Sequence, residues 1–258
     1  MMYAHGSATL SGHRSGNEDA VWVSPLPVGV IGVVADGMGG LQCGSEASSA
    51  VIRCFQQAFS NTRVGHGDAV STPARLLDAA AGAHRCICAI ADTNGTPYGA
   101  GSTVCAAVLS GGQWWVVHLG DTRCYYVTPH EIRRLTTDHS LAAQEQPYVL
   151  TRSLGETTFT GGVITPTPPL VGVLDEACRF MIVTDGVHGV LSDEHLHSLI
   201  MQASRQALNT AAQLVVEAAI AAGSRDNVSC VLLDHVPSGD NEARDRRRWW
   251  QRWRRGMA

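Results

Sequence analysis

Four aspartates in this chain of 258 residues lie where a run of mostly apolar residues meets a turn. Such a run is typical of a buried strand, and glycine or asparagine beside the carboxylate is typical of a turn. The four are Asp36 after Val28–Ala35, Asp121 after Trp114–Gly120, Asp185 after Phe180–Thr184, and Asp226 before Asn227–Leu233. Because strand ends at one edge of stacked sheets converge in space, the pattern predicts that these carboxylates gather at one place.

Carboxylates gathered in this way repel one another by several kcal/mol at low dielectric unless cations neutralise them. Hard carboxylate oxygens select magnesium, manganese or calcium. A single aspartate at a strand end is usually a turn or cap residue, but that explanation is much weaker for four aspartates together. The pattern therefore favours a site for divalent cations.

The charge of the chain is divided unevenly. The formal net charge is −4. The chain has no lysine, so all 19 cationic residues are arginines, and seven of them lie within Arg244–Arg255. The rest of the chain is therefore more acidic than the total suggests, and nothing in it predicts binding to nucleic acid. The composition, 45% apolar and 16% charged, is typical of a folded globular protein.

The sequence predicts neither a signal peptide nor a membrane-spanning segment. Residues Met1–Gly6 contain no basic or apolar leader, and apolar runs such as Val28–Ala35 have the length of a strand.

The eight cysteines are scattered, and the close pair Cys86 and Cys88 has no second pair at zinc-binding spacing. We expect reduced thiols in a cytoplasmic protein, and a monomer.

Hydrophobic periodicity predicts an α+β fold, because strands and helices occur in separate groups. The predicted helices are Ser45–Phe59 with Ser45 as N-cap, a helix beginning at Pro73, Asp193–Ser204 with Asp193 as N-cap, and Thr210–Ala222. The predicted strands are Val28–Ala35, the hairpin Ser102–Leu109 and Gln113–Leu119 with Cys124–Val127 extending it, Arg179–Val183, and Asn227–Val236.

A further segment, Gly12–Asp19, places an arginine beside two acidic residues, and a guanidinium suits bidentate binding of a phosphate. With it, a set of motifs occurs in a characteristic order: Arg14…Asn17-Glu18-Asp19, Asp36-Gly37-Met38-Gly39-Gly40, Gly101-Ser102-Thr103, Gly120-Asp121-Thr122-Arg123, Thr137-Asp138-His139-Ser140, Thr151-Arg152-Ser153-Leu154-Gly155, Thr184-Asp185-Gly186 and Arg225-Asp226-Asn227-Val228-Ser229. From about residue 6 to residue 236 the chain resembles the bacterial branch of the metal-dependent, type 2C protein phosphatases.

The resemblance implies a four-layer α-β-β-α sandwich with a dinuclear Mn²⁺ or Mg²⁺ centre between the two sheets. It implies hydrolysis of phosphoserine and phosphothreonine in proteins, by attack of a metal-activated water on phosphorus. The implied partners are substrate phosphoproteins and a cognate bacterial kinase, and the kinase rests on analogy with the family alone.

The resemblance also assigns roles to residues. Arg14 is expected to hold the substrate phosphate. The implied metal ligands are Asp36, which bridges both ions, the Gly37 carbonyl, Asp185 and Asp226, which complete the shell of one ion, and Glu18 and Asp19, which act through or beside bound water. A positional role is expected for His139.

The chain departs from the family pattern at two places. Bacterial members usually carry an aspartate four residues after the equivalent of Asp185 that supports a third ion, and this position is Gly189 here. Asp121 stays a candidate ligand for a third ion but lacks that partner. The flap after the Asp138 motif is also short, with only Leu141–Tyr148 before the next motif. Both changes leave the two-ion centre intact.

Residues 1–236 are thus expected to form the catalytic domain and 237–258 an Arg/Trp-rich tail. As a helix, the tail would place three tryptophans on one side, a pattern suited to an anionic membrane surface, an acidic partner or the acidic catalytic domain itself. A solvated end without function is the alternative. Two other classes of protein compete with the enzyme: a pseudophosphatase that binds phosphoproteins without hydrolysis, and a nucleic-acid or membrane-surface protein acting through the tail.

Overall fold

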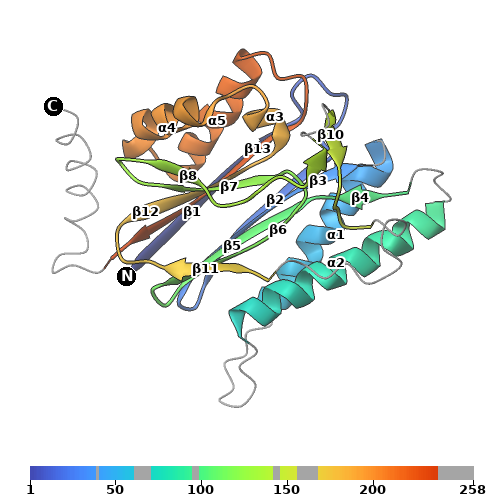
Figure 1. Ribbon diagram of the computed structural model, residues 1–258, viewed down its shortest axis with the longest axis horizontal. Helices are drawn as coiled ribbons and strands as arrows, with labels where there is room; N and C mark the ends of the chain where they lie inside the picture. Colours follow the sequence, from blue (N-terminus) through green and yellow to red (C-terminus); the bar gives the residue numbers. More distant parts are fainter. Residues whose placement is uncertain (39–40, 61–70, 95–98, 142–145, 156–167, 238–258) are drawn as a thin grey trace.

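The computed structural model describes residues 1–38, 41–60, 71–94, 99–141, 146–155 and 168–237. Two antiparallel sheets pack face to face, and each outer face is covered by helices (Figure 1). The five-stranded sheet contains, in spatial order, β1 (Met2–Leu10), β13 (Val228–Val236), β12 (Cys178–Val183), β7 (Arg123–Val127) and β8 (Ile132–Arg134).

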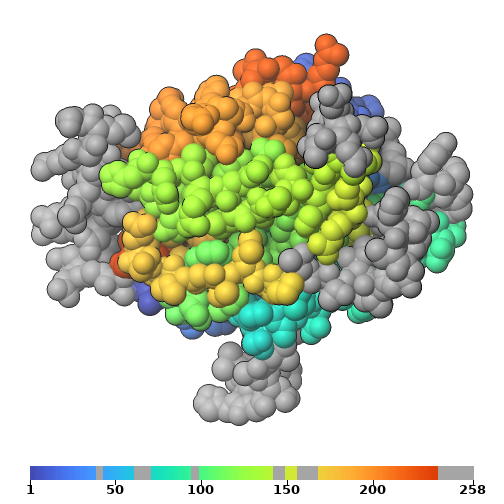
Figure 2. Space-filling view, viewed as in Figure 1, coloured from blue at the N-terminus to red at the C-terminus, as the bar shows by residue number. Residues whose placement is uncertain are grey.

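The six-stranded sheet contains the long strand that carries Asp36 near its C-terminal end. Its main path runs through β11 (Leu170–Val173), β6 (Gln113–Leu119), β5 (Val104–Ser110), β3 (Gly29–Met38) and β2 (Asp19–Leu26), and β4 (Gly101–Ser102) pairs with β3. Strand β11 forms one edge of the sheet and lies at the surface (Figure 2). A small separate hairpin pairs β9 (Ser140–Leu141) with β10 (Gln146–Leu150).

The helices divide between the two faces (Figure 1). Two of them cover the six-stranded sheet, α1 (Leu41–Ser60) and α2 (Thr72–Asn94). The five-stranded sheet is covered by α3 (Asp185–His188), α4 (Asp193–Gln202), a 3₁₀ turn at Ala203–Arg205, and α5 (Leu208–Ala221). Within the described ranges, no helix is long and apolar enough to cross a membrane.

Strand alternation produces three hydrophobic layers. Val30 and Val34 of β3 point into the layer between the sheets, whereas Ile31 and Val33 point toward α1 and α2. A third layer lies between the five-stranded sheet and α5. Successive residues of one strand face opposite sides, so a strand buried on both faces is apolar throughout. The predicted α-β-β-α sandwich is confirmed.

One predicted strand lies in a different place. Cys124–Val127 was expected to extend the hairpin of β5 and β6, but β7 pairs with β12 and β8 in the other sheet. The chain crosses between sheets at Gly120, whose φ of 107° lies in the left-handed region. A side chain at this conformation is strained, so glycine permits the crossing.

Two predicted helix caps are wrong. Helix α1 begins at Leu41, so Ser45 lies inside it. Helix α4 is capped by Ser192, whose Oγ accepts a hydrogen bond from the His195 N–H at 3.2 Å, and Asp193 is the first helical residue. The tail prediction falls on residues 238–258, which lie outside the described ranges.

Candidate metal centre

Asp19 and Asp36 face each other across the β2–β3 pair, where they are register partners. The Asp19 side chain is buried, and its Oδ2 accepts hydrogen bonds from Thr184 Oγ1 at 3.0 Å and Ser229 Oγ at 2.6 Å. These bonds join β2 to the ends of two strands in the opposite sheet. The second oxygen, Oδ1, is buried with no hydrogen-bond partner among the described residues. A buried carboxylate oxygen without a partner is costly, and a cation would satisfy it.

The backbone of Asp36 is fixed by neighbouring hydroxyls. Its N–H donates to Thr103 Oγ1 at 3.0 Å, and its carbonyl accepts from the Thr103 N–H at 2.8 Å and from Ser102 Oγ at 3.1 Å. Thr103 Oγ1 also lies 2.7 Å from Thr122 Oγ1, next to Asp121. The backbone bonds therefore hold Asp36 in place without using its carboxylate.

Two glycines bring β3 and α1 together beside Asp36. A Cβ on Gly37 would lie 2.0 Å from the Gly44 carbonyl oxygen, so no side chain fits there. A Cβ on Gly44 would lie 2.6 Å from Glu18 Oε2 and 3.1 Å from the Gly37 carbonyl oxygen. The close approach gathers the Glu18 carboxylate and the Gly37 carbonyl on one side of Asp36, as hard oxygen ligands require.

Asp185 and Asp226 come from the ends of β12 and β13. Asp185 is the first residue of the short helix α3. Asp226 Oδ1 accepts the Asn227 N–H at 2.8 Å, and Oδ2 accepts from Arg14 Nη2 at 2.8 Å. The Arg14 side chain is 59% exposed, so its guanidinium stands at the mouth of the site. It can therefore meet an anion that arrives from solvent.

Asn227 fixes the loop that carries Arg14. Its Nδ2 donates to the carbonyls of Ser11 at 3.0 Å and Gly16 at 2.9 Å, and its Oδ1 accepts the Glu18 N–H at 2.9 Å. Asn227 is buried, so these three bonds are shielded from water. The asparagine thus positions both the arginine and the adjacent acids.

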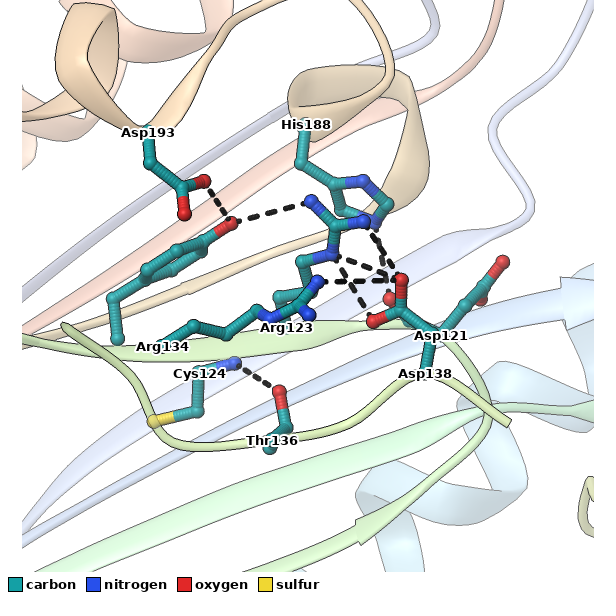
Figure 3. Close-up of polar contacts among 9 residues, drawn as sticks. Asp121, Arg123, Cys124, Arg134, Thr136, Asp138, His188 and Asp193 are labelled. Carbon is teal, nitrogen blue, oxygen red and sulfur yellow. Dashed lines mark hydrogen bonds and ion pairs between the residues drawn. The ribbon is translucent and has the colours of Figure 1, made fainter. Parts of the chain in front are cut away.

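Asp121 follows β6 in a turn that several polar side chains hold (Figure 3). His188 Nε2 donates to the Asp121 carbonyl at 3.0 Å, and burial, together with nearby Arg123, lowers the pKa of His188 to about 4. The Arg123 guanidinium binds both oxygens of Asp138, with Nη2 to Oδ2 at 2.7 Å. The turn is therefore rigid, and a neutral imidazole supports it.

His139 supports the same turn. The ring Nδ1 of His139 accepts the Gly120 backbone N–H at 3.1 Å, and the backbone N–H of His139 donates to the Gly120 carbonyl at 2.8 Å. Its ring stacks on His118, with centroids 4.9 Å apart. His139 therefore contacts the turn that carries Asp121, and its positional role stays a prediction.

The carboxylates of the site influence one another electrostatically. Burial, followed by neighbouring acids, raises the pKa of Asp19 to about 7 and that of Asp121 to about 7. Burial and then the charges of Asp19, Asp185, Asp121 and Asp226 raise the pKa of Asp36 well above its usual range. The pKa of Asp185 is raised by burial and by Asp226. Each negative charge is therefore unfavourable in this place without a compensating cation.

The described part of the chain contains no group of three His, Cys, Asp or Glu side chains already arranged around a metal position. Two of the carboxylates are engaged elsewhere, Asp226 with Arg14 and Asp19 Oδ2 with hydroxyls. The donor set nevertheless fits hard divalent cations, because it consists of oxygens, includes the unpartnered Asp19 Oδ1, and carries excess negative charge. Sequence reasoning did not anticipate the roles of Thr184, Ser229 and Asn227, although each stands one to three residues from a predicted ligand.

The fold and the site agree with a known family. A sequence model of the family "Protein phosphatase 2C" matches residues 12–222. The chain belongs to the protein phosphatase 2C family. Asp19, Asp36 and Asp185 lie within the matched range, and Asp226 lies four residues after it.

Two curated members of the protein phosphatase 2C family show the extent of the similarity. The serine/threonine protein phosphatase PstP of Mycobacterium tuberculosis is 27% identical over 234 residues, which cover 86% of this chain and 43% of PstP. The serine/threonine phosphatase stp of Listeria monocytogenes is 26% identical over 217 residues, covering 78% of this chain and 83% of stp. The chain thus spans less than half the length of PstP.

Solved structures of family members share the fold. The catalytic domain of PstP in complex with two manganese ions superposes with a TM-score of 0.76 at 24% identity, covering 91% of this chain and 99% of that domain. The serine/threonine phosphatase of S. agalactiae gives a TM-score of 0.77 at 23% identity, covering 92% of this chain and all of that one. These likenesses establish the architecture.

Proposed function

We propose that this chain is a metal-dependent protein serine/threonine phosphatase that hydrolyses phosphoserine and phosphothreonine. The observation that carries the proposal is the Asp19–Asp36 pair between the sheets, in which Asp19 is buried and one of its carboxylate oxygens is unpartnered among the described residues. The hydrogen bonds of Asp19 Oδ2 join the two sheets, but they do not offset the repulsion between two adjacent carboxylates, which destabilises the folded chain. Bound divalent cations would neutralise the repelling carboxylates, so metal binding would stabilise the folded chain.

The residues that would hold two Mn²⁺ or Mg²⁺ ions are Asp36, the Gly37 carbonyl, Asp185 and Asp226, with Asp19 and Glu18 beside them. When bound, the ions supply Lewis acidity, which makes a water nucleophilic at neutral pH and neutralises charge in the transition state. Arg14 binds the substrate phosphate at the mouth of the site. A phosphate would compete with Asp226 for this guanidinium, since the two are ion-paired at 2.8 Å.

Substrates are proposed to be phosphoproteins that a cognate kinase has modified. The shallow position of Arg14, which is more than half exposed, favours a phosphate on a protein surface over a small buried substrate. A cytoplasmic location is proposed because all eight cysteines are free thiols. We also propose that the catalytic domain is monomeric.

The test is release of phosphate from a phosphothreonine peptide, measured with added manganese and after treatment with chelator. If the proposal is correct, the chain will hydrolyse the peptide in the presence of manganese and lose this activity in chelator. The competing pseudophosphatase would bind the same peptide, measurably by fluorescence anisotropy, without releasing phosphate in either condition. Hydrolysis that persists at the same rate in chelator would contradict a metal-dependent reaction.

For the tail at 237–258 we propose a role in attachment, argued from the sequence alone. Three of the six tryptophans and seven arginines lie in this short segment, a composition suited to an anionic surface. Truncation after Ser238 is expected to abolish sedimentation with anionic vesicles and to leave aryl phosphate turnover unchanged. Higher turnover after truncation would instead indicate autoinhibition, and no change in either measurement would leave the tail without a function.

A further inference from the structure

A pair of cysteines lies between the two helices that cover the six-stranded sheet. Helices α1 and α2 run side by side there (Figure 1), and Cys54 Sγ of α1 lies 3.9 Å from Cys86 Sγ of α2. Cys86 is exposed and Cys54 is half-buried, whereas five of the other six cysteines are buried. The two thiols are therefore neighbours in space at the surface, although they lie 32 positions apart in the chain.

Close packing of the helices brings the thiols together. A Cβ added to Gly82 would lie 3.8 Å from Cys54 Sγ, so the backbone of α2 passes close to Cys54. Cys86 is one helical turn after Gly82 and shares its face of the helix. A disulfide has an S–S length of about 2.05 Å, so the sulfurs must approach by about 2 Å. Side-chain rotation of two unbranched residues suffices for a movement of this size.

The surroundings suit reaction at one thiol before the other. Burial, and then the neighbouring thiol, raises the pKa of Cys54 to about 11, while Arg53 and Arg85 oppose this shift. Cys86 is the thiol that a small oxidant in solvent reaches first. We therefore expect the exposed Cys86 to react first and Cys54, which stays protonated, to react second.

We propose that Cys54 and Cys86 form a reversible disulfide in response to a hydroperoxide, which crosslinks α1 to α2. The Cys86 thiolate attacks the peroxide, giving a sulfenic acid and, for hydrogen peroxide, one water. Cys54 then attacks the Cys86 sulfur, the S–O bond breaks, and a second water leaves. Both sulfurs are oxidised, the peroxide is reduced, and the two thiol protons end in water.

Cys88 provides the matched control on the same helix. It faces away from α1, because its Sγ lies 3.7 Å from His84 Nε2 and 3.8 Å from the Gly155 carbonyl oxygen. The Cys88→Ser variant therefore retains the proposed pair and removes the nearest competing thiol. Neither Cys54 nor Cys86 belongs to the candidate metal centre, so the test does not depend on phosphatase activity.

The experiment treats the full chain, wild type and Cys88→Ser, with hydrogen peroxide, blocks the remaining thiols by alkylation under denaturing conditions, and digests with trypsin. Cleavage after Arg53 and Arg85 should yield a crosslinked species of peptides 54–63 and 86–123. Its mass should be two hydrogen atoms below the sum of the two peptides, counted with the alkyl groups on the other cysteines of peptide 86–123, Cys88 and Cys105 in wild type and Cys105 in Cys88→Ser. Dithiothreitol should separate the two peptides. Cys54→Ser and Cys86→Ser should each abolish the species.

A second readout is thermal unfolding of the folded protein. A crosslink restrains the unfolded chain, so peroxide should raise the unfolding temperature of wild type and Cys88→Ser by several degrees and not that of Cys86→Ser. The proposal is overturned if Cys86 accumulates sulfinic or sulfonic acid in wild type without the crosslinked species. It is also overturned if Cys54 is found joined to Cys88 instead.

Discussion

At the scale of single residues, the proposed site depends on how the Arg14 loop is held beside Asp226. The ion pair between them is exposed, and exposed pairs contribute only about 0–1 kcal/mol to stability. Asn227 is different, because it is buried and makes three hydrogen bonds to the loop. We therefore expect the two residues to share one task, in which Arg14 binds phosphate and Asn227 positions Arg14.

We predict that Arg14→Ala raises KM for aryl phosphate more than it lowers kcat, because the arginine binds phosphate in the ground state as well as in the transition state. Asn227→Ala should also raise KM, and should destabilise the fold by about 1–3 kcal/mol through unsatisfied backbone groups. The double variant should lose less than the sum of the single losses, since both act on the same contact.

The measurement is steady-state kinetics with thermal unfolding of each variant, and Arg205→Ala serves as a remote exposed control. An unchanged KM for Arg14→Ala, with metal affinity retained, would show that another group holds the phosphate. Full additivity of the two losses would show that Asn227 has a role separate from Arg14.

Ligand candidates could be predicted from the sequence because each is marked by its neighbours, as Asp36 is by the preceding strand and following glycine. The hydroxyl partners of Asp19 could not be predicted. Thr184 and Ser229 are 165 and 210 positions away in the chain, and only the packing of the two sheets brings them to the carboxylate. Hydrogen bonds of this kind depend on tertiary structure, which local patterns do not encode.

At the scale of elements, the buried strands and amphipathic helices were predictable from periodicity. Apart from the hairpin of β5 and β6, the sheet partners of the strands were not. The first strand, Met2–Leu10, contains His5, Gly6, Ser7 and Thr9, so its apolar signal is weak, and pairing with β13 defines it. The assignment of β7 to the hairpin failed because proximity in the chain favours the nearest strand, whereas β7 crosses to the other sheet. Glycine obscured the start of α1, since Gly44 suggests a turn but permits close packing on Gly37.

Helix α3 ends at Gly189, the position that is expected to determine whether a third ion binds. A Cβ there would lie 2.8 Å from the Asp185 carbonyl oxygen. We predict two manganese sites of usable affinity in wild type by calorimetric titration. Gly189→Asp should add or tighten a third site with Asp121, after a small shift of the α3 backbone.

Gly189→Ala is the matched control, because it carries the same steric cost without the carboxylate. A third site in the aspartate variant alone is the expected outcome. Three tight sites in wild type would refute the prediction, and a third site in the alanine variant would assign the effect to the backbone shift.

At the scale of the whole molecule, the buried carboxylates connect metal binding to stability. The pKa of Asp19 is about 7 in the folded chain, against about 3.9 for an unfolded aspartate. The folded state therefore binds more protons than the unfolded state between these values, and its stability falls as pH rises through about 7. Histidines with a lowered pKa, such as His188, make the folded state more stable as pH rises. This opposite effect occurs only below about pH 6.5, where the histidine of the unfolded chain becomes protonated.

We predict that the chelator-treated protein has a smaller free energy of unfolding at pH 8 than at pH 6.5, measured by urea denaturation. Manganese at pH 8 should restore the loss, because it compensates the charges. Asp19→Asn should show a weaker pH dependence in chelator. Stability that rises with pH over this interval would contradict the account of the buried carboxylates.

The most direct test of the central claim is the rate of aryl phosphate hydrolysis by Asp36→Asn at saturating manganese. The change keeps the size of the side chain and removes one of the negative charges that would hold the ions. Asp78→Asn, on the exposed side of α2, is the control for the same chemical change. The account predicts a loss of several orders of magnitude for Asp36→Asn and none for the control. A rate for Asp36→Asn within about tenfold of wild type, a difference of about 1.4 kcal/mol, would contradict two-metal catalysis at this site.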